Sequence, residues 1–277
     1  MTNYISLLRI KDWLKNVVII FPLLFSGFIL EIEPLNLQKL LIYFVSFCLV
    51  TSVVYIFNDI RDLEEDKLNP LKQRRPLASG VLRKNDAYYS VIILTLIILS
   101  NVLIFNLDLF HYFLFYFFNN LLYNFIFKKI HLINSLSISL GFLIRLYLGS
   151  EIVNISLEPW LIILVFFGSF LLSVIKKYSD KVTDTGNLKI KHDILVINTT
   201  IFLMSIIYVM HLVDVSVFNL FNSVISTIFF LLSLVLLKLG VKEINNSVDT
   251  IYILINDYRF VVSLIIWFVH YYFYRYF

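Results

Sequence analysis

Three aspartates stand at regular spacing directly after a long apolar run. Asp59, Asp62 and Asp66 occupy positions i, i+3 and i+7 in the stretch NDIRDLEED. If the apolar helix continues through this stretch, the three carboxylates fall on one face. Stacked like charges need a compensating cation, and oxygen ligands so spaced suit Mg²⁺, which bridges substrate phosphates. We therefore predict that these aspartates bind Mg²⁺ and are the catalytic residues.

Polar and basic side chains accompany the aspartates. Asn58 lies four residues before Asp62, and Lys72, Arg74 and Arg75 follow in the same loop. Carboxylate-bound Mg²⁺ combined with Lys and Arg is suited to hold a diphosphate leaving group. The sequence therefore indicates a diphosphate site at the end of this helix.

Two further acids in the stretch do not fit the metal pattern. Glu64 and Glu65 fall mostly off the aspartate face and are predicted to be solvated. The alternative for the whole stretch is a solvated helix end, with its acids balanced by Arg61 and Lys67. The tight spacing and the adjacent basic cluster favour the diphosphate site.

The elements that must carry this site are membrane helices. Of the 277 residues, 60% are hydrophobic, and the mean hydropathy of +0.85 is far above that of soluble globular proteins. A membrane span needs about 20 mostly apolar residues. The segments that qualify are about 14–32, 37–57, 87–107, 110–127, 132–150, 160–175, 194–213, 217–238 and 260–276. We predict an all-α integral membrane protein with nine transmembrane helices in a single domain, residues 1–277.

The basic residues predict the orientation in the membrane. The N-terminus and the loops after the second, fourth, sixth and eighth spans carry 20 of the 23 Lys and Arg residues. The exceptions are Lys39, Arg145 and Arg275. Positively charged loops stay in the cytoplasm, so we expect a cytoplasmic N-terminus and active site and an external C-terminus. The net charge of +4 then reflects topology and attraction to anionic lipid, and we expect no nucleic-acid partner.

The aspartate stretch carries a resemblance to a known family. N-D-x-x-D-x-x-x-D at 58–66, followed by P-x-K-x-x-R-P-[IL]-A-S-G at 70–80, resembles the signature of the UbiA superfamily of intramembrane prenyltransferases. The resemblance implies nine helices around a central cavity that faces the cytoplasm, with a Mg²⁺-dependent active site.

Four other segments narrow the resemblance. RIKDWLKN (9–16), YNFIFKKI (123–130), LGFLIRLYLGS (140–150) and SVIKKYSD (173–180) resemble the decaprenyl-phosphate phosphoribosyltransferase branch. That branch implies a bacterial inner-membrane transferase acting for the cell envelope. It would join phosphoribosyl diphosphate to a polyprenyl phosphate and release diphosphate. The sequence departs from the branch where Ile10 replaces Pro, Asn134 replaces Asp and Asp180 replaces Glu.

Positive charge is the chemical requirement of such a reaction. The acceptor phosphate is already an anion, so it needs charge-assisted hydrogen bonds for positioning and no dedicated general base. Arg145 lies inside a predicted span, where a charge is costly and usually faces a cavity or a partner. The predicted substrate-binding residues are Asn58, Lys15, Lys72, Arg75, Tyr123, Lys128, Arg145, Lys176 and Lys177.

Two other functions remain open from the sequence. A prenyltransferase acting on an aromatic or other small acceptor would carry a second acidic motif, and Asp180 and Asp184 form a D-x-x-x-D. Lys176 and Lys177, directly before that motif, favour phosphate binding. A transporter or non-catalytic membrane protein is disfavoured. Transporters bind ions on broken helices near the membrane midplane, whereas the acids of this chain lie at the membrane boundary. A homo-oligomer remains open.

Overall fold

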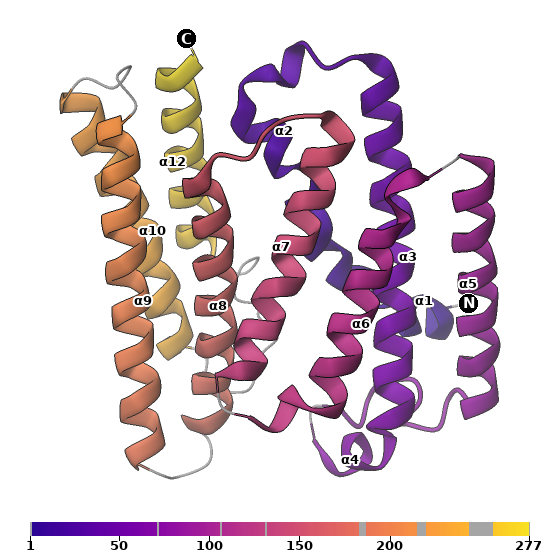
Figure 1. The fold of residues 1–277 in the computed structure, drawn as a ribbon. Coiled ribbons are helices and arrows are strands. Elements are labelled where there is room, and N and C mark those ends of the chain that lie inside the picture. The colour runs from indigo at the N-terminus through magenta and orange to yellow at the C-terminus, as the bar shows by residue number, and fades with distance from the viewer. Residues whose placement is uncertain are drawn as a thin grey trace. The chain divides into compact units, whose positions relative to one another are not determined.

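The structure is a computed structural model that describes residues 2–70, 72–105, 107–130, 132–182, 187–214, 220–243 and 257–276 (Figure 1). Every regular element in these ranges is a helix, which confirms the predicted all-α class. The chain divides into two compact units. One comprises Met1–Ile130 and Ile144–Ser156, and the other comprises His131–Leu143 and Leu157–Phe277. The prediction of a single membrane domain stays a prediction.

The first unit is built around one long helix, α3. Its helices are α1 (Thr2–Leu7), η1 (Ile10–Ile20), α2 (Phe21–Ser26), η2 (Phe28–Leu30), α3 (Pro34–Arg61), α4 (Leu63–Leu68), α5 (Lys84–Ile104), η3 (Asp108–Phe110), α6 (His111–Phe125), η4 (Phe127–Lys129) and the second half of α7 (Ile133–Val153). α3 packs against η1, α5 and α6 (Figure 1). Tyr43 and Phe47 of α3 are buried against Phe113 and Tyr116 of α6. Burial of these large aromatic surfaces stabilises α3 as the support of its acidic end.

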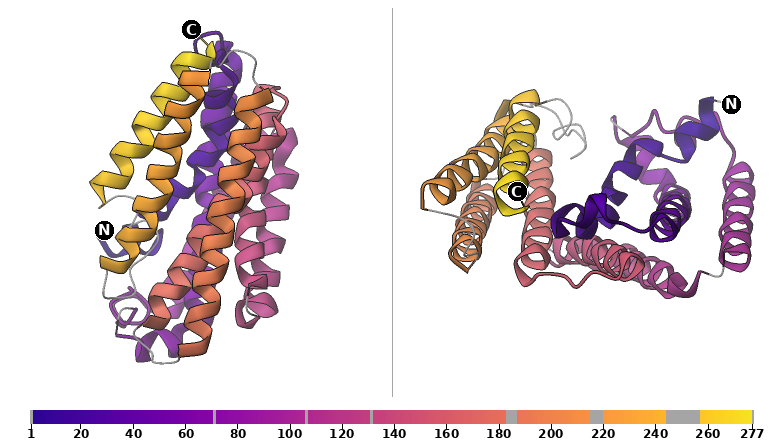
Figure 2. Two further views of the ribbon diagram at one scale, coloured as in Figure 1. Left: turned by 90° about the vertical axis from the view of Figure 1, so that its left-hand side faces the viewer. Right: turned by 90° about the horizontal axis from the view of Figure 1, so that it is seen from above.

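The second unit is a set of long apolar helices. It contains the first half of α7, then α8 (Pro159–Val182), α9 (Asn187–Asp214), α10 (Leu220–Glu243) and α12 (Tyr258–Tyr276). α8 packs on α9, and α10 packs on both α9 and α12. Figure 2 shows α9, α10 and α12 running alongside one another.

Six described helices are long and apolar enough to cross a membrane. They are Pro34–Arg61, Lys84–Ile104, Ile133–Val153, Pro159–Tyr178, His192–Asp214 and Leu220–Leu239, with a shorter apolar helix at Tyr258–Phe273. These seven correspond to seven of the nine predicted spans. The predicted span 110–127 corresponds to the 15-residue α6, shorter than the roughly 20 residues that a helix needs to span a bilayer. The number of nine spans and the sides of the termini stay predictions.

The predicted span 14–32 is not one helix. The segment contains most of η1, then α2 and η2. Pro22 stands in the first turn of α2, and Gly27 ends that helix in the left-handed conformation, with φ 79°. Proline cannot donate the hydrogen bond that a continuing helix needs, and a left-handed glycine is a common helix stop. Hydropathy alone registers the apolar run and not these two interruptions.

Arg275, one of the three exceptions to the predicted charge asymmetry, forms an ion pair. Arg275 near the end of α12 donates to a carboxylate oxygen of Glu158, which lies just before α8. Trp160 stacks on His211 of α9 with ring centroids 4.1 Å apart, and the Nε2 of His211 lies 2.9 Å from the Tyr271 hydroxyl. Arg275 therefore has a local partner that offsets its charge at an end of the second unit predicted to lie outside.

Candidate active site

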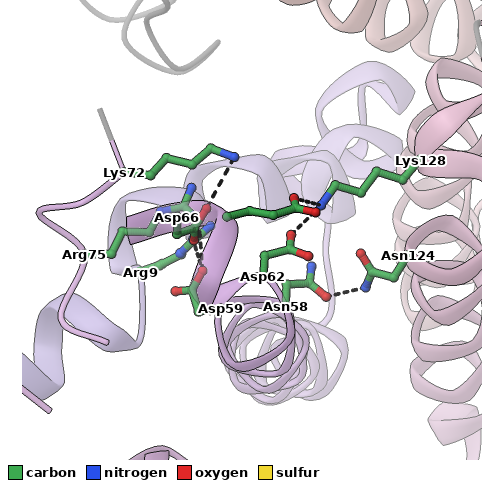
Figure 3. Close-up of polar contacts among 10 residues, drawn as sticks. Arg9, Asn58, Asp59, Asp62, Asp66, Lys72, Arg75, Asn124 and Lys128 are labelled. Carbon is green, nitrogen blue, oxygen red and sulfur yellow. Dashed lines mark hydrogen bonds and ion pairs between the residues drawn. The ribbon is translucent and has the colours of Figure 1, made fainter. Parts of the chain in front are cut away.

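The acidic stretch bends at its middle aspartate. α3 ends at Arg61, and Asp62 leaves the helical conformation with φ −87° and ψ 9° before α4 begins at Leu63. The assumption of one continuous helix through Asp59, Asp62 and Asp66 is therefore wrong. The aspartates on either side of the bend fall into two groups (Figure 3). Asp59 and Asp66 both form ion pairs with Arg75, whereas Asp62 forms an ion pair with Lys128.

Asp59 and Asp66 form the buried group. Arg75 Nη1 lies 3.1 Å from Asp59 Oδ1 and 2.6 Å from Asp66 Oδ2. The side chains of the two aspartates are only 4% and 2% exposed. Lys72 Nζ adds an ion pair at 3.5 Å to Asp66 Oδ1. Buried carboxylates are costly unless cations pair with them, so the basic cluster after α4 is what allows this pair to exist.

Arg9 is a member of this group that the sequence did not assign to the site. Its guanidinium donates to Asp59 Oδ1 from 50 positions away in the chain. Arg9 adopts the left-handed conformation, with φ 50°, immediately before η1. Such backbone is uncommon outside glycine and costs about 1–3 kcal/mol. The only sequence signal was its place at the start of RIKDWLKN, a motif that gave resemblance without a role.

Asp62 belongs to a second polar group. Lys128 Nζ lies 2.5 Å from Asp62 Oδ2 and 3.7 Å from Glu65 Oε2. Beside it, the Asn124 amide of α6 donates to Asn58 Oδ1 (Figure 3). The fold thus brings the predicted cation Lys128 to Asp62, and Asn124 to the predicted site residue Asn58.

The two glutamates are exposed, as predicted. The side chains of Glu64 and Glu65 are 76% and 77% exposed. Lys67 Nζ lies 2.9 Å from Glu64 Oε1, and this hydrogen bond lowers the pKa of Glu64 below its ordinary value. Glu64 is therefore a surface acid with a surface partner.

Lys15 and Tyr123 lie near the polar groups. Lys15 Nζ is 2.6 Å from Asp12 Oδ1 and 3.4 Å from the Tyr55 hydroxyl. Tyr123 is half-buried on α6, within electrostatic reach of Lys128, Asp62 and Lys15. The first unit thus gathers Tyr123 and Lys128 near Asp62, just beyond the end of α3, with Lys15 within electrostatic reach of Tyr123.

Two of the remaining predicted cations, Arg145 and Lys177, donate to neutral side chains. Arg145 of α7 is buried in the first unit, where it donates to Asn16 and Tyr116. Lys177 of α8 belongs to the second unit, where its ammonium donates to Asn134 and, at 2.6 Å, to Ser135. Lys176 is half-buried beside it in sequence.

The second acidic motif, Asp180 and Asp184, falls at the end of the described part of α8. Asp184 lies outside the described residues, and the side chain of Asp180 is likewise outside them. The alternative that rests on this D-x-x-x-D stays a prediction.

The donor set of the buried group fits a hard divalent cation. Within the described ranges, no group of three or more His, Cys, Asp or Glu residues is gathered closely enough to hold a metal ion. Yet Asp66 Oδ1 is buried and accepts no hydrogen bond from the residues that the structure describes, with the Lys72 ammonium 3.5 Å away as an ion-pair partner. It therefore keeps an acceptor position suited to Mg²⁺. Asp59 and Asp66 face a common guanidinium, which stands where a cation shared by both carboxylates would stand. The residues present therefore fit Mg²⁺ bound in exchange for arginine contacts.

The fold and this site define an all-helical protein with membrane-length helices and an acidic site surrounded by cations. A model of the UbiA prenyltransferase family matches residues 19–252. The chain belongs to the UbiA prenyltransferase family, a family of membrane-embedded transferases.

Two relatives have the same function. The decaprenyl-phosphate phosphoribosyltransferases of Mycolicibacterium smegmatis and Corynebacterium glutamicum are 31% and 33% identical over 181 and 179 residues. These matches cover 65% and 64% of this chain and 57% and 54% of the relatives' own length. A shorter match, 37% identical over 97 residues, is to the digeranylgeranylglyceryl phosphate synthase of Methanocaldococcus jannaschii and covers 34% of this chain and 32% of that protein.

Solved structures share the fold. A UbiA homolog from Archaeoglobus fulgidus bound to GPP and Mg²⁺ superimposes with a TM-score of 0.68 and covers 97% of each chain at 15% identity. Identity at this level shows the UbiA fold alone. The Mg²⁺ belongs to that homolog.

Proposed function

We propose that this protein transfers the 5-phosphoribosyl group from phosphoribosyl diphosphate to a polyprenyl phosphate and releases diphosphate. The observation that carries the proposal is the pair of buried carboxylates, Asp59 and Asp66, faced by Arg75, Arg9 and Lys72. An acidic pair surrounded by cations suits a metal–diphosphate complex, which brings both positive and negative charge. The phosphoribosyltransferase relatives at 31% and 33% identity support the ribosyl donor.

The residues of the buried group act on the donor. When bound, Mg²⁺ would neutralise the departing diphosphate, with Asp59, Asp62 and Asp66 as its proposed ligands and Asn58 beside them. Lys72 and Arg75, and Arg9 with them, would turn from the carboxylates to the donor phosphates. Charge-assisted hydrogen bonds from arginine to phosphate are about twice as strong as neutral ones. These contacts favour the state in which the bond between ribose C1 and the diphosphate oxygen breaks.

The acceptor needs positioning more than activation. An oxygen of the lipid phosphate forms the new bond to C1 as the bond to diphosphate breaks, and no proton has to be removed. Lys15 and Lys128 would hold the lipid phosphate or the donor 5-phosphate, with Tyr123 as a hydrogen-bond donor. Lys176 and Lys177 of the second unit are proposed for the same task. Desolvated electrostatic contacts of this kind commonly contribute most of the rate enhancement.

A donor screen tests the proposal. Purified protein in lipid with Mg²⁺ is given labelled phosphoribosyl diphosphate and a polyprenyl phosphate, and the lipid phase is assayed for label. We expect a lipid-soluble phosphoribosyl product, and we expect its formation to stop with a chelator and resume with added Mg²⁺. Absence of that product in the presence of Mg²⁺ would contradict the proposal.

The second candidate is prenyl transfer to an aromatic or other small acceptor. The family name and the relative from Methanocaldococcus jannaschii favour it. Turnover of a prenyl diphosphate, with none of phosphoribosyl diphosphate, would establish this alternative. Turnover of neither donor, and no thermal stabilisation by Mg²⁺ with phosphoribosyl diphosphate, would point to a transporter or a non-catalytic protein. We further propose the bacterial inner membrane as the location, with the site facing the cytoplasm.

A further inference from the structure

Arg145 is buried in the first unit and held by neutral groups of other helices. Arg145 is only 3% exposed. Arg145 Nε lies 2.7 Å from Asn16 Oδ1, and Nη2 lies 3.0 Å from the Tyr116 hydroxyl. The guanidinium also lies over the rings of Tyr116 and Phe47, 4.5 Å and 5.2 Å from their centroids. Arg145 thus connects α7 to η1, α3 and α6.

Asn16 extends this connection from η1 to α3. The residue is fully buried, and its Nδ2 lies 3.2 Å from Cys48 Sγ and 3.3 Å from Thr51 Oγ1. Its amide therefore accepts from α7 on one side and donates to α3 on the other. Buried amides that satisfy both their donor and acceptor groups hold a fixed orientation. η1 is consequently gripped between two long helices at this residue.

A second contact holds η1 against α7 one turn further along. Gly149 follows Arg145 by four residues, so the two lie on the same face of α7. A Cβ atom added at Gly149 would stand 1.9 Å from the backbone oxygen of Ile19. Only a residue without a side chain permits this approach of the two backbones. Arg145 and Gly149 together form what we term the α7 clamp on η1.

The held segment carries basic side chains of the proposed active site. Lys15 directly precedes Asn16, and Arg9 directly precedes the first residue of η1. Trp13 lies between them and donates from Nε1 to Ser52 Oγ at 2.9 Å. A shift of η1 would therefore move both Lys15 and Arg9 relative to α3, which carries Asp59.

We propose that Arg145 and Gly149 are positioning residues, which set the place of Lys15 and Arg9 through η1. Neither residue needs to touch a substrate for this role, which differs from the direct phosphate contact that the sequence predicts for Arg145. The effect on donor binding rests on the proposed function. The seating of η1 on α7 does not, because it is a property of the free protein.

Trp13 provides a reporter that is independent of activity. The chain has three tryptophans, and Trp160 and Trp267 both belong to the second unit. Protein labelled with 5-fluorotryptophan gives one fluorine resonance for each of the three tryptophans. The resonance that disappears in Trp13→Phe is assigned to Trp13. The variants are Arg145→Met, Asn16→Leu, their double mutant and Gly149→Ala.

The matched control is a second helical glycine. A Cβ added at Gly168 of α8 would meet only Met204 Cε, at an ordinary contact distance of 3.8 Å. Gly168→Ala should leave the Trp13 resonance and the KM for phosphoribosyl diphosphate unchanged. The same chemical change is thereby made with and without contact to η1.

The proposal predicts a joint response. The Trp13 resonance should shift in all four variants while Trp160 and Trp267 keep theirs. The KM for phosphoribosyl diphosphate should rise about tenfold, as for one displaced charged hydrogen bond. In the double mutant of Arg145 and Asn16, the KM should rise no more than in the more strongly affected single mutant. The reason is that both residues act through the contact that they make with each other. Gly149→Ala alters no charge, so its response separates positioning from charge removal.

Other outcomes are equally clear. A raised KM in Arg145→Met with an unmoved Trp13 resonance and normal Gly149→Ala kinetics would overturn the clamp in favour of direct substrate contact. A shifted Trp13 resonance with an unchanged KM would overturn the positioning role. If the unmodified protein does not turn over phosphoribosyl diphosphate at all, the proposed function fails, while the Trp13 shifts still decide whether the clamp exists.

Discussion

Removal of the guanidinium shared by Asp59 and Asp66 tests the electrostatics of the site. In Arg75→Met the two buried carboxylates lose their common partner, although Asp59 keeps Arg9 and Asp66 keeps Lys72 at 3.5 Å. Breaking a fully buried ion pair costs about 3–5 kcal/mol. Arg75 is 28% exposed and alternative cations remain, so we expect a loss of about 2 kcal/mol. That corresponds to a fall in melting temperature of about 4–8 °C.

The response to Mg²⁺ is the more diagnostic part of this experiment. At the proposed metal site, Mg²⁺ would have to displace Arg75 from both carboxylates of the unmodified protein, whereas in Arg75→Met that competitor is gone. A ligand present at 100 times its Kd stabilises the folded state by about 2.7 kcal/mol. We therefore expect Mg²⁺ to raise the melting temperature of Arg75→Met more than that of the unmodified protein, with phosphoribosyl transfer still impaired.

The assay is thermal unfolding in detergent or nanodiscs at constant ionic strength, with and without Mg²⁺. Arg74→Met is the matched control, because Arg74 is an exposed neighbour with no ion pair among the described residues, and its stability should change by less than about 0.5 kcal/mol. Equal Mg²⁺ shifts in all three proteins would refute the reasoning, since the carboxylates would then not be the metal ligands.

Four further substitutions separate the roles of the acids. Asp62→Asn should abolish phosphoribosyl transfer at a nearly unchanged melting temperature, because the ion pair of Asp62 with Lys128 is partly exposed. Asp59→Asn should lose both activity and stability. Retained turnover in Asp62→Asn would remove Asp62 from the metal site. Glu64→Gln should leave transfer rates unchanged, because Glu64 is a surface acid, and a large rate loss would show otherwise. Glu158→Gln should lower stability by about 1 kcal/mol by weakening the pair with Arg275 and spare transfer; thermal unfolding with a transfer assay checks this.

The sequence predicted the long helices well because a helix that crosses a membrane must be apolar along its whole length. Seven apolar segments correspond to described helices of the expected position. The segment 14–32 is equally apolar but contains Pro22 and Gly27, whose effects are local and invisible to an average over a window. Its departure from one helix is the part of the fold that composition could not reveal.

The site was predictable in its residue types and less so in its geometry. Asp59, Asp62 and Asp66 were identified by their spacing, and Glu64 and Glu65 were separated from them. The bend at Asp62 was not predicted, because helical spacing assumes a continuous helix and one partner of the stretch, Lys128, lies 66 residues from Asp62 in the chain. Arg9 was missed for the same reason, since nothing local indicates a partner 50 residues away.

The 3₁₀ winding of η1 determines which of its side chains share one edge and how long the segment is. A 3₁₀-helix repeats every three residues with a rise of about 2.0 Å, so Trp13, Asn16 and Ile19 fall on one edge of the 11-residue segment. An α-helix turns by about 100° per residue with a rise of 1.5 Å. Rewinding η1 as an α-helix would shorten it by about 5 Å and rotate Ile19 by about 120° relative to Trp13. Trp13 and Asn16 contact α3, and the backbone of Ile19 approaches Gly149 of α7. A change of winding would therefore displace at least one of these residues from its contact.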